Sequence, residues 1–270
     1  MDETFNQLLR DQSVSKESKL CIGLDIDSDR MPETMDRSIE GIKEYLFDVI
    51  DSTTDLCIAY KLNMAFYERY GSKGYELMEK VVDYINGRNL TIADGKRGDI
   101  GNTTQKYAIS IFETIGFDSI TVSPYMGADS IIPFIHDKSK GIFVLCLTSN
   151  ESAKDIQFIS HNNLNVYDYV SNLAEKLNNN NNIGLVVGAT KPEYMSKIRK
   201  SNNLPWLIPG IGAQGGDLEK SVKISNSNSS IGIINVSRAI IFAGDCRING
   251  VNEAAKIFNK KINSVEVYEQ

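Results

Sequence analysis

The stretch GIFVLCLTS, residues 141–149, opens with seven small or apolar residues and ends in two hydroxyl side chains. Its apolar part is continuous rather than alternating, and it is rich in Val, Ile and Leu. Such a run is typical of a strand that is buried on both faces of a parallel sheet. Because parallel strands are joined by crossover segments that are usually helical, the rest of the chain has to supply further strands and helices.

Seven similar runs recur along the chain at fairly regular intervals, and the segments between them have mostly helical patterns. In YELMEKVVDYING, residues 75–87, the apolar residues follow i, i+1, i+4, i+5, i+8 spacing, which places them on one face of a helix that Gly87 can end. NVYDYVSNLAEKL, residues 165–177, has a similar stripe. The seven runs are CIGLDI (21–26), LCIAYKL (56–62), LTIAD (90–94), SITVSP (119–124), IGLVVGAT (183–190), WLIPGIG (206–212) and IGIINVS (231–237).

Eight buried strands separated by helical segments, in a chain of 270 residues, predict an α/β fold of the (β/α)8, or TIM-barrel, type. We expect a single barrel domain over residues 1–270, with about the first 18 residues as an extra helical segment. A doubly wound open sheet is the alternative. No G-x-G-x-x-G motif follows the first run, so the commonest cofactor signature of that alternative is missing.

The composition limits the kind of function. With 41% hydrophobic and 24% charged residues, the chain can bury a sizeable core. A net charge of −6 provides no basic stripe for nucleic acid, although a few local donors could hold one small phosphorylated ligand. Only two histidines are present, which disfavours zinc sites and histidine-based triads. The proton chemistry of an enzyme would therefore fall to Lys and Asp, with no metal.

The cysteines and the N-terminus bear on where the protein works. Cys21, Cys57, Cys146 and Cys246 form no C-x-x-C pair, and three of them lie in apolar runs, which favours reduced core thiols in a reducing compartment. The opening MDETFNQLLRDQ lacks the apolar core of a signal peptide. No apolar run reaches the roughly 18 residues of a membrane span. We expect a cytoplasmic protein with no membrane partner.

Two biased polar segments, LNNNNNIG with five asparagines at 178–182 and SNSNSS at 225–230, lie between a helical pattern and the next strand. We expect both to be solvated loops at the N-terminal end of the barrel. A role in an interaction is the alternative, which composition alone does not favour.

Polar side chains gather where the runs end, and active sites of TIM barrels lie at the C-terminal ends of the strands. A single charge at such a place is usually just the beginning of a solvated loop. However, Asp25, Lys61, Asp94 and Lys96 come from three consecutive strands and would converge at one mouth. Asp94 and Lys96 are two positions apart, so an extended chain points both side chains the same way. Because neighbouring carboxylates keep lysines protonated, this array presents a fixed proton donor beside a fixed negative charge.

The last two strand ends form a second set of candidates. The segment GIGAQGGD, residues 210–217, follows the seventh of the eight predicted strands, and its glycines leave backbone N–H groups free for a close ligand. TIM barrels commonly bind phosphate at the loops after strands 7 and 8. The glycines alone would also fit simple tight turns. Arg238, which can donate two hydrogen bonds at once, makes phosphate binding the better interpretation. The candidates are Gly212, Gln214, Gly215, Gly216, Ser237 and Arg238.

The spacing Asp94-x-Lys96-x-x-Asp99-Ile100, within DGKRGDIGNT (94–103), resembles the signature of the orotidine 5'-phosphate decarboxylase family, in the version of its longer-chain branch. Other segments agree in the same order from about residue 20 to 250. The chain departs from the family pattern beside functional positions, at Ile26, at Leu62 and in SNESA (149–153). The agreeing segments are GLD (23–25), K-x-N-x-AFYE (61–68), YGSKG (70–74), SPYMG-x-DS (123–130), TSN (148–150), PGIGAQGGD (209–217) and SRAI (237–240).

The resemblance implies a lyase that decarboxylates orotidine 5'-monophosphate to uridine 5'-monophosphate without a cofactor, the last step of de novo pyrimidine biosynthesis. It implies an alternating charged network of Lys61, Asp94, Lys96 and Asp99. In this network Lys96 delivers a proton to C6 of the pyrimidine after CO2 is lost. Asp94 would lie near the departing CO2 group.

The resemblance also implies how ligands and partners are bound. The protein would be a homodimer, in which Asp99, Ile100 and Thr103 complete the pocket of a neighbouring subunit. An orotate phosphoribosyltransferase is a further candidate partner. The other substrate-binding residues that the resemblance implies are Asp25, Asn63, Thr148, Ser149, Pro209, Gln214, Gly215, Ser237 and Arg238.

Two other functions stay open. One is a sugar-phosphate decarboxylase or aldolase on the same barrel with a similar D-x-K-x-x-D pattern, which stabilises an enediolate with a divalent metal and is sensitive to chelators. The other is a non-catalytic binder of a phosphate ligand, or a scaffold that uses its Asn-rich loops. A binder has no need of a lysine held between carboxylates.

Overall fold

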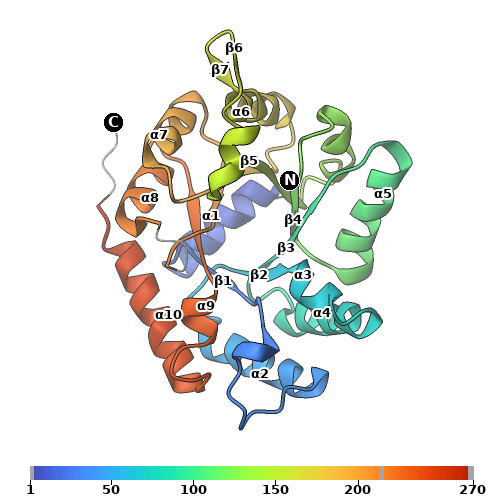
Figure 1. Ribbon diagram of the computed structural model, residues 1–270, viewed down its shortest axis with the longest axis vertical. Helices are drawn as coiled ribbons and strands as arrows, with labels where there is room; N and C mark the ends of the chain where they lie inside the picture. The colour runs from blue at the N-terminus through green and yellow to red at the C-terminus, as the bar shows by residue number, and fades with distance from the viewer. Residues whose placement is uncertain (1–2, 213–215, 267–270) are drawn as a thin grey trace.

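The computed structural model describes residues 3–212 and 216–266, and its centre is a closed barrel of eight parallel strands (Figure 1). Around the barrel the order is β1-β2-β3-β4-β5-β8-β9-β10, and β10 pairs with β1. The predicted (β/α)8 barrel is confirmed, and each strand overlaps one of the eight apolar runs. The strands are β1 (Leu20–Gly23), β2 (Ala59–Asn63), β3 (Leu90–Arg97), β4 (Ser119–Val122), β5 (Gly141–Leu147), β8 (Ile183–Val187), β9 (Trp206–Ile208) and β10 (Gly232–Val236).

Helices surround the strands, as Figure 1 shows. The helices predicted over 75–87 and 165–177 correspond to α4 and α6. Helix α4 ends at Ile85, and the Asn86 that caps it has a left-handed backbone. The connection from β4 to β5, which is described throughout, has two short 3-10 turns instead of an α-helix. After β5, a hairpin of β6 (Ser160–His161) and β7 (Leu164–Asn165) projects from the barrel. The helices are α2 (Ile39–Thr53), α3 (Met64–Glu68), α4 (Ser72–Ile85), α5 (Gly101–Ile109), α6 (Val166–Leu177), α7 (Pro192–Ser201), α8 (Leu218–Ser225), α9 (Arg238–Ile241) and α10 (Ile248–Asn263).

Helix α1 (Phe5–Ser15) lies across the N-terminal end of the barrel, behind the strands in Figure 1. Its Phe5 and Leu9 are buried with residues from the strand interiors, including Phe143 of β5. The Phe5 and Phe143 rings pack edge to face with their centroids 6.0 Å apart. A side chain at Gly141 would collide with the Phe5 ring. This end of the barrel is therefore filled, which leaves the C-terminal ends of the strands for a ligand.

The expectation that both asparagine-rich segments are solvated loops is wrong in part. They do lie at the N-terminal end of the barrel, since they lead into β8 and β10. However, Asn182 is fully buried, and its Nδ2 donates to three backbone carbonyls, one of them that of Lys140 at 2.9 Å. Asn226 is also buried, and its Oδ1 accepts a hydrogen bond from the N–H of Gly232. These side-chain amides form hydrogen bonds with backbone groups that would otherwise lack a partner inside the fold. This role accounts for the burial of the two asparagines.

All four cysteines are buried and free, as the sequence predicted. Burial raises the pKa of the Cys57 thiol to about 12, so this group is a neutral core side chain at physiological pH. Within the described residues, no helix combines the length and the apolar character that crossing a bilayer requires.

Candidate active site

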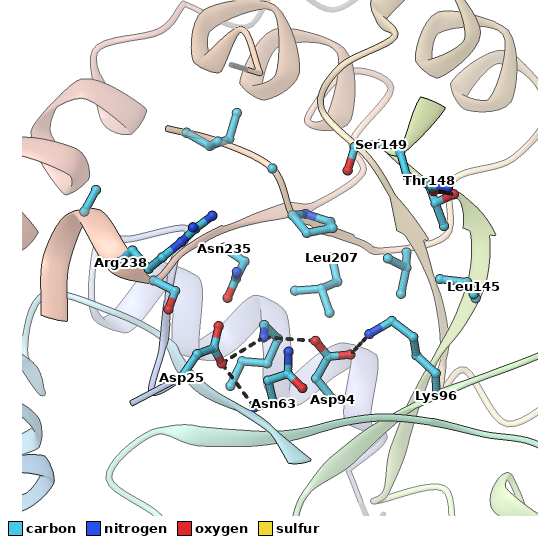
Figure 2. Close-up of a pocket in the computed structure, with 18 residues that line it drawn as sticks. Asp25, Asn63, Asp94, Lys96, Leu145, Thr148, Ser149, Leu207, Asn235 and Arg238 are labelled. Carbon is cyan, nitrogen blue, oxygen red and sulfur yellow. Dashed lines mark hydrogen bonds and ion pairs between the residues drawn. The ribbon is translucent and has the colours of Figure 1, made fainter. Parts of the chain in front are cut away.

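A cavity of about 560 Å³ opens at the C-terminal ends of the barrel strands (Figure 2). This is the end of the barrel where the sequence predicts the active site. Figure 2 shows Lys96 and Arg238 at opposite ends of the cavity, with Asp25 and Asp94 between them. The predicted site residues that line the cavity are Asp25, Lys61, Asn63, Asp94, Lys96, Thr148, Ser149, Pro209, Ser237 and Arg238.

Lys61, on β2, is at the centre of the charged group. Its side chain is 3% exposed, and its Nζ lies 3.0 Å from Oδ2 of Asp94 and 3.5 Å from Oδ1 of Asp25. Burial alone would lower the pKa of Lys61, but the two carboxylates outweigh burial and raise it. Burial likewise opposes the charge of Asp94, yet Lys61 and Lys96 hold the pKa of Asp94 below its usual value. Lys61 and Asp94 are therefore both charged at neutral pH.

Asp94 and Lys96 lie at the C-terminal end of β3, in a β-bulge. The register between β3 and β4 shifts there, so that residues 94–96 together face only Thr121. Lys96 has a φ of +44°, in the left-handed region that side chains disfavour. Its Nζ lies 2.7 Å from Oδ1 of Asp94. The two side chains meet as expected, but the extended backbone assumed there is wrong at Lys96, whose left-handed conformation lies within the bulge.

The other end of the cavity has the features of an anion site. Arg238 begins α9 directly after β10. The Oγ of Ser237 is buried and has no hydrogen-bond partner among the described residues. A side chain at Gly23 would collide with Ser237, so this glycine lets the ends of β1 and β10 approach closely. The predicted Gln214 and Gly215 lie outside the described residues. An arginine beside an unpartnered hydroxyl fits a phosphate group.

Thr148 and Ser149 follow β5 and face the cavity from the side opposite Asp94 (Figure 2). Gln157 holds Thr148, because its Oε1 accepts from the Thr148 N–H at 2.9 Å and its Nε2 donates to the Thr148 Oγ1 at 2.8 Å. A Cβ atom at Gly188 would lie 2.8 Å from the backbone nitrogen of Ser149. The end of β5 is therefore fixed by a side chain on one side and by close backbone packing on the other.

Asp99, Ile100 and Thr103 are not among the residues that line the cavity of this chain. They lie just beyond β3 and in the first turn of α5. The Asp99 carboxylate accepts a hydrogen bond from the Ile100 N–H, and the Ile100 side chain is 54% exposed. Among the residues that the structure describes, these three are therefore not part of the wall of their own chain's cavity.

Sequence reasoning missed two polar residues of this region. Asn235, in the interior of β10, lines the cavity near Asp25, as Figure 2 shows. Thr121, on β4, donates a hydrogen bond to the Asp94 carboxylate. Both residues lie within predicted buried strands and are flanked by apolar residues. The only indication of a functional role in the sequence was a polar side chain within such a strand.

The fold and the site together define a TIM-barrel enzyme with a lysine–carboxylate centre and an arginine, Arg238, at the other end of its cavity. The model of the "Orotidine 5'-phosphate decarboxylase / HUMPS family" matches residues 18–249, and the chain belongs to this family.

Individual relatives agree with this assignment. The chain is 42% identical to an orotidine 5'-phosphate decarboxylase of Dehalococcoides mccartyi, over 96% of this chain and 97% of that protein. The solved OMP decarboxylase of Leishmania donovani aligns with a TM-score of 0.86 and 35% identity, over 97% of this chain and 99% of that one. The solved Leishmania donovani UMP synthase aligns with a TM-score of 0.88 and 36% identity, over 98% of this chain and 57% of that one.

Proposed function

We propose that this chain decarboxylates orotidine 5'-monophosphate to uridine 5'-monophosphate, the last step of de novo pyrimidine biosynthesis, without a cofactor. The observation that carries the proposal is the contact of 2.7 Å between Lys96 and Asp94 in a cavity that ends at Arg238. A lysine held against a largely buried carboxylate suits proton delivery to a carbanion-like carbon. The identity of the proposed substrate comes from the family to which the chain belongs and from the names of its relatives.

The charged group accounts for the reaction as follows. Loss of CO2 leaves negative charge at C6 of the pyrimidine. The ammonium of Lys96 is in place where this charge develops, so it stabilises the transition state more than the ground state. Lys96 then donates its proton to C6. Asp94 holds Lys96 and repels the substrate carboxylate, while Lys61 keeps Asp94 charged.

The remaining residues bind the substrate away from the reacting carbon. Asp25 and Lys61 hold the ribose hydroxyls, and the Asn63 N–H orients Asp25 through a hydrogen bond of 3.1 Å to its Oδ1. Ser149, beside Thr148, contacts the pyrimidine. Binding energy from the distant phosphate contributes to closing the loops around C6. The residues proposed around the phosphate are Pro209, Gln214, Gly215, Ser237 and Arg238.

The first experiment mixes the purified protein with orotidine 5'-monophosphate and EDTA, and follows the ultraviolet absorbance of the orotate ring. Rapid loss of signal with the chelator present supports the cofactor-free decarboxylase. No change, with circular dichroism showing a folded protein, contradicts it. The next trial would then add magnesium and a keto-sugar phosphate, which tests the metal-dependent alternative. A nucleotide that binds without turnover would support the non-catalytic binder.

The homodimer is part of this proposal. Exposed apolar side chains follow both β3 and β4: Ile100, next to Asp99, is 54% exposed, and Tyr125 and Met126 are 83% and 46% exposed. The two segments are joined by a hydrogen bond of 2.8 Å from the Ser123 N–H to the Arg97 carbonyl. Helix α5 contacts the 3-10 turns that follow this β4 loop, so these side chains belong to one region. Two chains that cover these surfaces would bring Asp99 and Thr103 of each chain toward the cavity of the other.

We propose a cytoplasmic enzyme that is supplied by an orotate phosphoribosyltransferase, either separate or associated. The substrate is a ribonucleotide of orotate, which a phosphoribosyl transfer to orotate would produce. The buried, reduced cysteines support a reducing compartment.

A further inference from the structure

One hydroxyl group, the Oγ1 of Thr121, joins the two residues that carry the proposed chemistry. It donates a hydrogen bond of 3.0 Å to Oδ1 of Asp94, and it accepts one of 3.0 Å from the backbone N–H of Lys96. Thr121 is 1% exposed, so bulk water does not compete for either bond. The hydroxyl therefore fixes the Asp94 side chain relative to the Lys96 backbone.

These two bonds lie inside the bulge at the end of β3. Before it, Ala93 pairs with Ile120, and after it Arg97 pairs with Val122. Between these pairs the N–H of Lys96 is bonded to the side chain of Thr121. A bulge of this kind re-aims a side chain, and the left-handed backbone of Lys96 needs surrounding contacts that hold it. The Thr121 hydroxyl is such a contact.

We propose that Thr121 is a positioning residue for the proton donor. Its hydroxyl holds the bulge in the form that keeps the Lys96 Nζ against Asp94 and in the cavity. Thr121 is not among the residues that line the cavity, so it acts through Lys96 and Asp94. This inference rests on the proposed function, because a proton donor has to be positioned only where a reaction takes place.

The same strand pair offers a matched control. At the other end of β3, the Oγ1 of Thr91 donates to Oδ2 of Asp118 at 2.8 Å and accepts from the Asp118 N–H at 2.9 Å. Thr91 is 2% exposed. It thus has the same residue type, burial and bonding pattern as Thr121, but its hydroxyl bonds to Asp118 and not to Asp94 or Lys96. Removing its hydroxyl measures the cost of losing two buried hydrogen bonds without touching the charged group.

The test compares wild type, Thr121→Val, Thr121→Ser and Thr91→Val for kcat and KM with orotidine 5'-monophosphate, for UMP affinity and for melting temperature. We expect kcat of Thr121→Val to fall by about 10- to 100-fold, because small displacements of a catalytic group are costly. The UMP dissociation constant should stay within about threefold, since the binding contacts remain. Thr121→Ser should keep kcat within about threefold of wild type. Thr91→Val should melt earlier without losing kcat.

Normal kcat in Thr121→Val, or a loss in Thr121→Ser as large as in Thr121→Val, would overturn the positioning role. If Thr121→Val does not fold, Thr121→Ala removes the same hydroxyl without placing a methyl group in the bulge, and the same kcat criterion applies. Wild-type protein without turnover would remove the proposed function and this inference together. An active wild type with an equally active Thr121→Val would remove only the inference.

Discussion

The Nζ of Lys96 lies 2.7 Å from Oδ1 of Asp94, and the two side chains differ in exposure, at 46% for Lys96 and 13% for Asp94. The carboxylate is held in the cavity wall, where it also accepts hydrogen bonds from Lys61 and Thr121. The ammonium instead faces the space that a ligand would fill. The group that would give up a proton is therefore accessible, and the group that holds it is fixed.

Replacing Lys96 by Ala should remove turnover and keep nucleotide binding. We expect kcat to fall by at least about 10³-fold, because both charge stabilisation and proton delivery are lost. UMP binding, measured by calorimetry, should remain detectable. Lys80→Ala, which removes an exposed lysine of α4 paired with Glu76, is the control and should keep full activity. Near-normal turnover in Lys96→Ala would exclude Lys96 as the proton donor.

Replacing Arg238 by Ala tests the anion site. Charge-assisted hydrogen bonds to a phosphate should contribute about 1.5–3 kcal/mol, so kcat/KM for orotidine 5'-monophosphate should fall by about 10- to 100-fold. The slow turnover of orotidine, which has no phosphate, should be unaffected. Arg69→Ala is the control, since this arginine is 45% exposed and lies outside the cavity. An equal loss with both substrates would show that Arg238 acts on something other than phosphate.

The barrel could be predicted from the sequence because parallel strands buried on both faces have continuous apolar runs. The strand β8 (Ile183–Val187), for example, is buried at every position. The hairpin of β6 and β7 was missed because its strands, of two residues each, are too short to show the alternation of apolar and polar residues that predicts a strand. The burial of Asn182 was also missed, since composition does not separate an amide bonded to the core from a solvated one.

The site was predictable where a charged side chain interrupts the end of an apolar run, as for Asp25, Lys61 and Asp94. It was not predictable where a neutral polar side chain lies within such a run, as for Thr121 and Asn235. The bulge at residues 94–96 depends on how β3 is aligned with β4. This register is set by contacts between two strands and cannot be read from the spacing of residues along one of them.

Replacing Lys61 by Met should lower the free energy of unfolding by about 3–5 kcal/mol at neutral pH, because Asp94 and Asp25 lose a buried partner. In wild type the raised pKa of Lys61 makes its stabilisation fully present below the ordinary lysine pKa. The lowered pKa of Asp94 makes its stabilisation present above the ordinary carboxyl pKa and lost as the pH falls through the folded-state value. Both contributions are thus complete near pH 7.

The difference between wild type and Lys61→Met should shrink as the pH falls from about 7 to about 5. In the variant, Asp94 keeps its contact with Lys96 but loses the one with Lys61, so its pKa rises above the wild-type value. A proton taken up by Asp94 in the folded state then relieves the poorly compensated charge. Urea unfolding at the two pH values measures this, with Lys80→Ala as the control. A difference that stays constant or grows toward acid pH would contradict the ion-pair account.

Mixing two inactive variants tests whether Asp99 completes a neighbouring subunit's site. Lys96→Ala lacks the proposed proton donor, and Asp99→Ala lacks the residue proposed to cross the interface. In a mixed dimer one site would combine an intact Lys96 with an intact Asp99 from the other chain, while the second site would lack both. If subunits exchange freely at a one-to-one ratio, half the dimers are mixed, and about a quarter of wild-type activity should return. The control mixture contains Lys96→Ala and Lys61→Met. Each variant lacks a residue that lines the cavity of its own chain, so neither site of a mixed dimer is complete and the mixture should stay inactive. No recovery after exchange, with sedimentation showing dimers, would mean that Asp99 serves its own subunit or none.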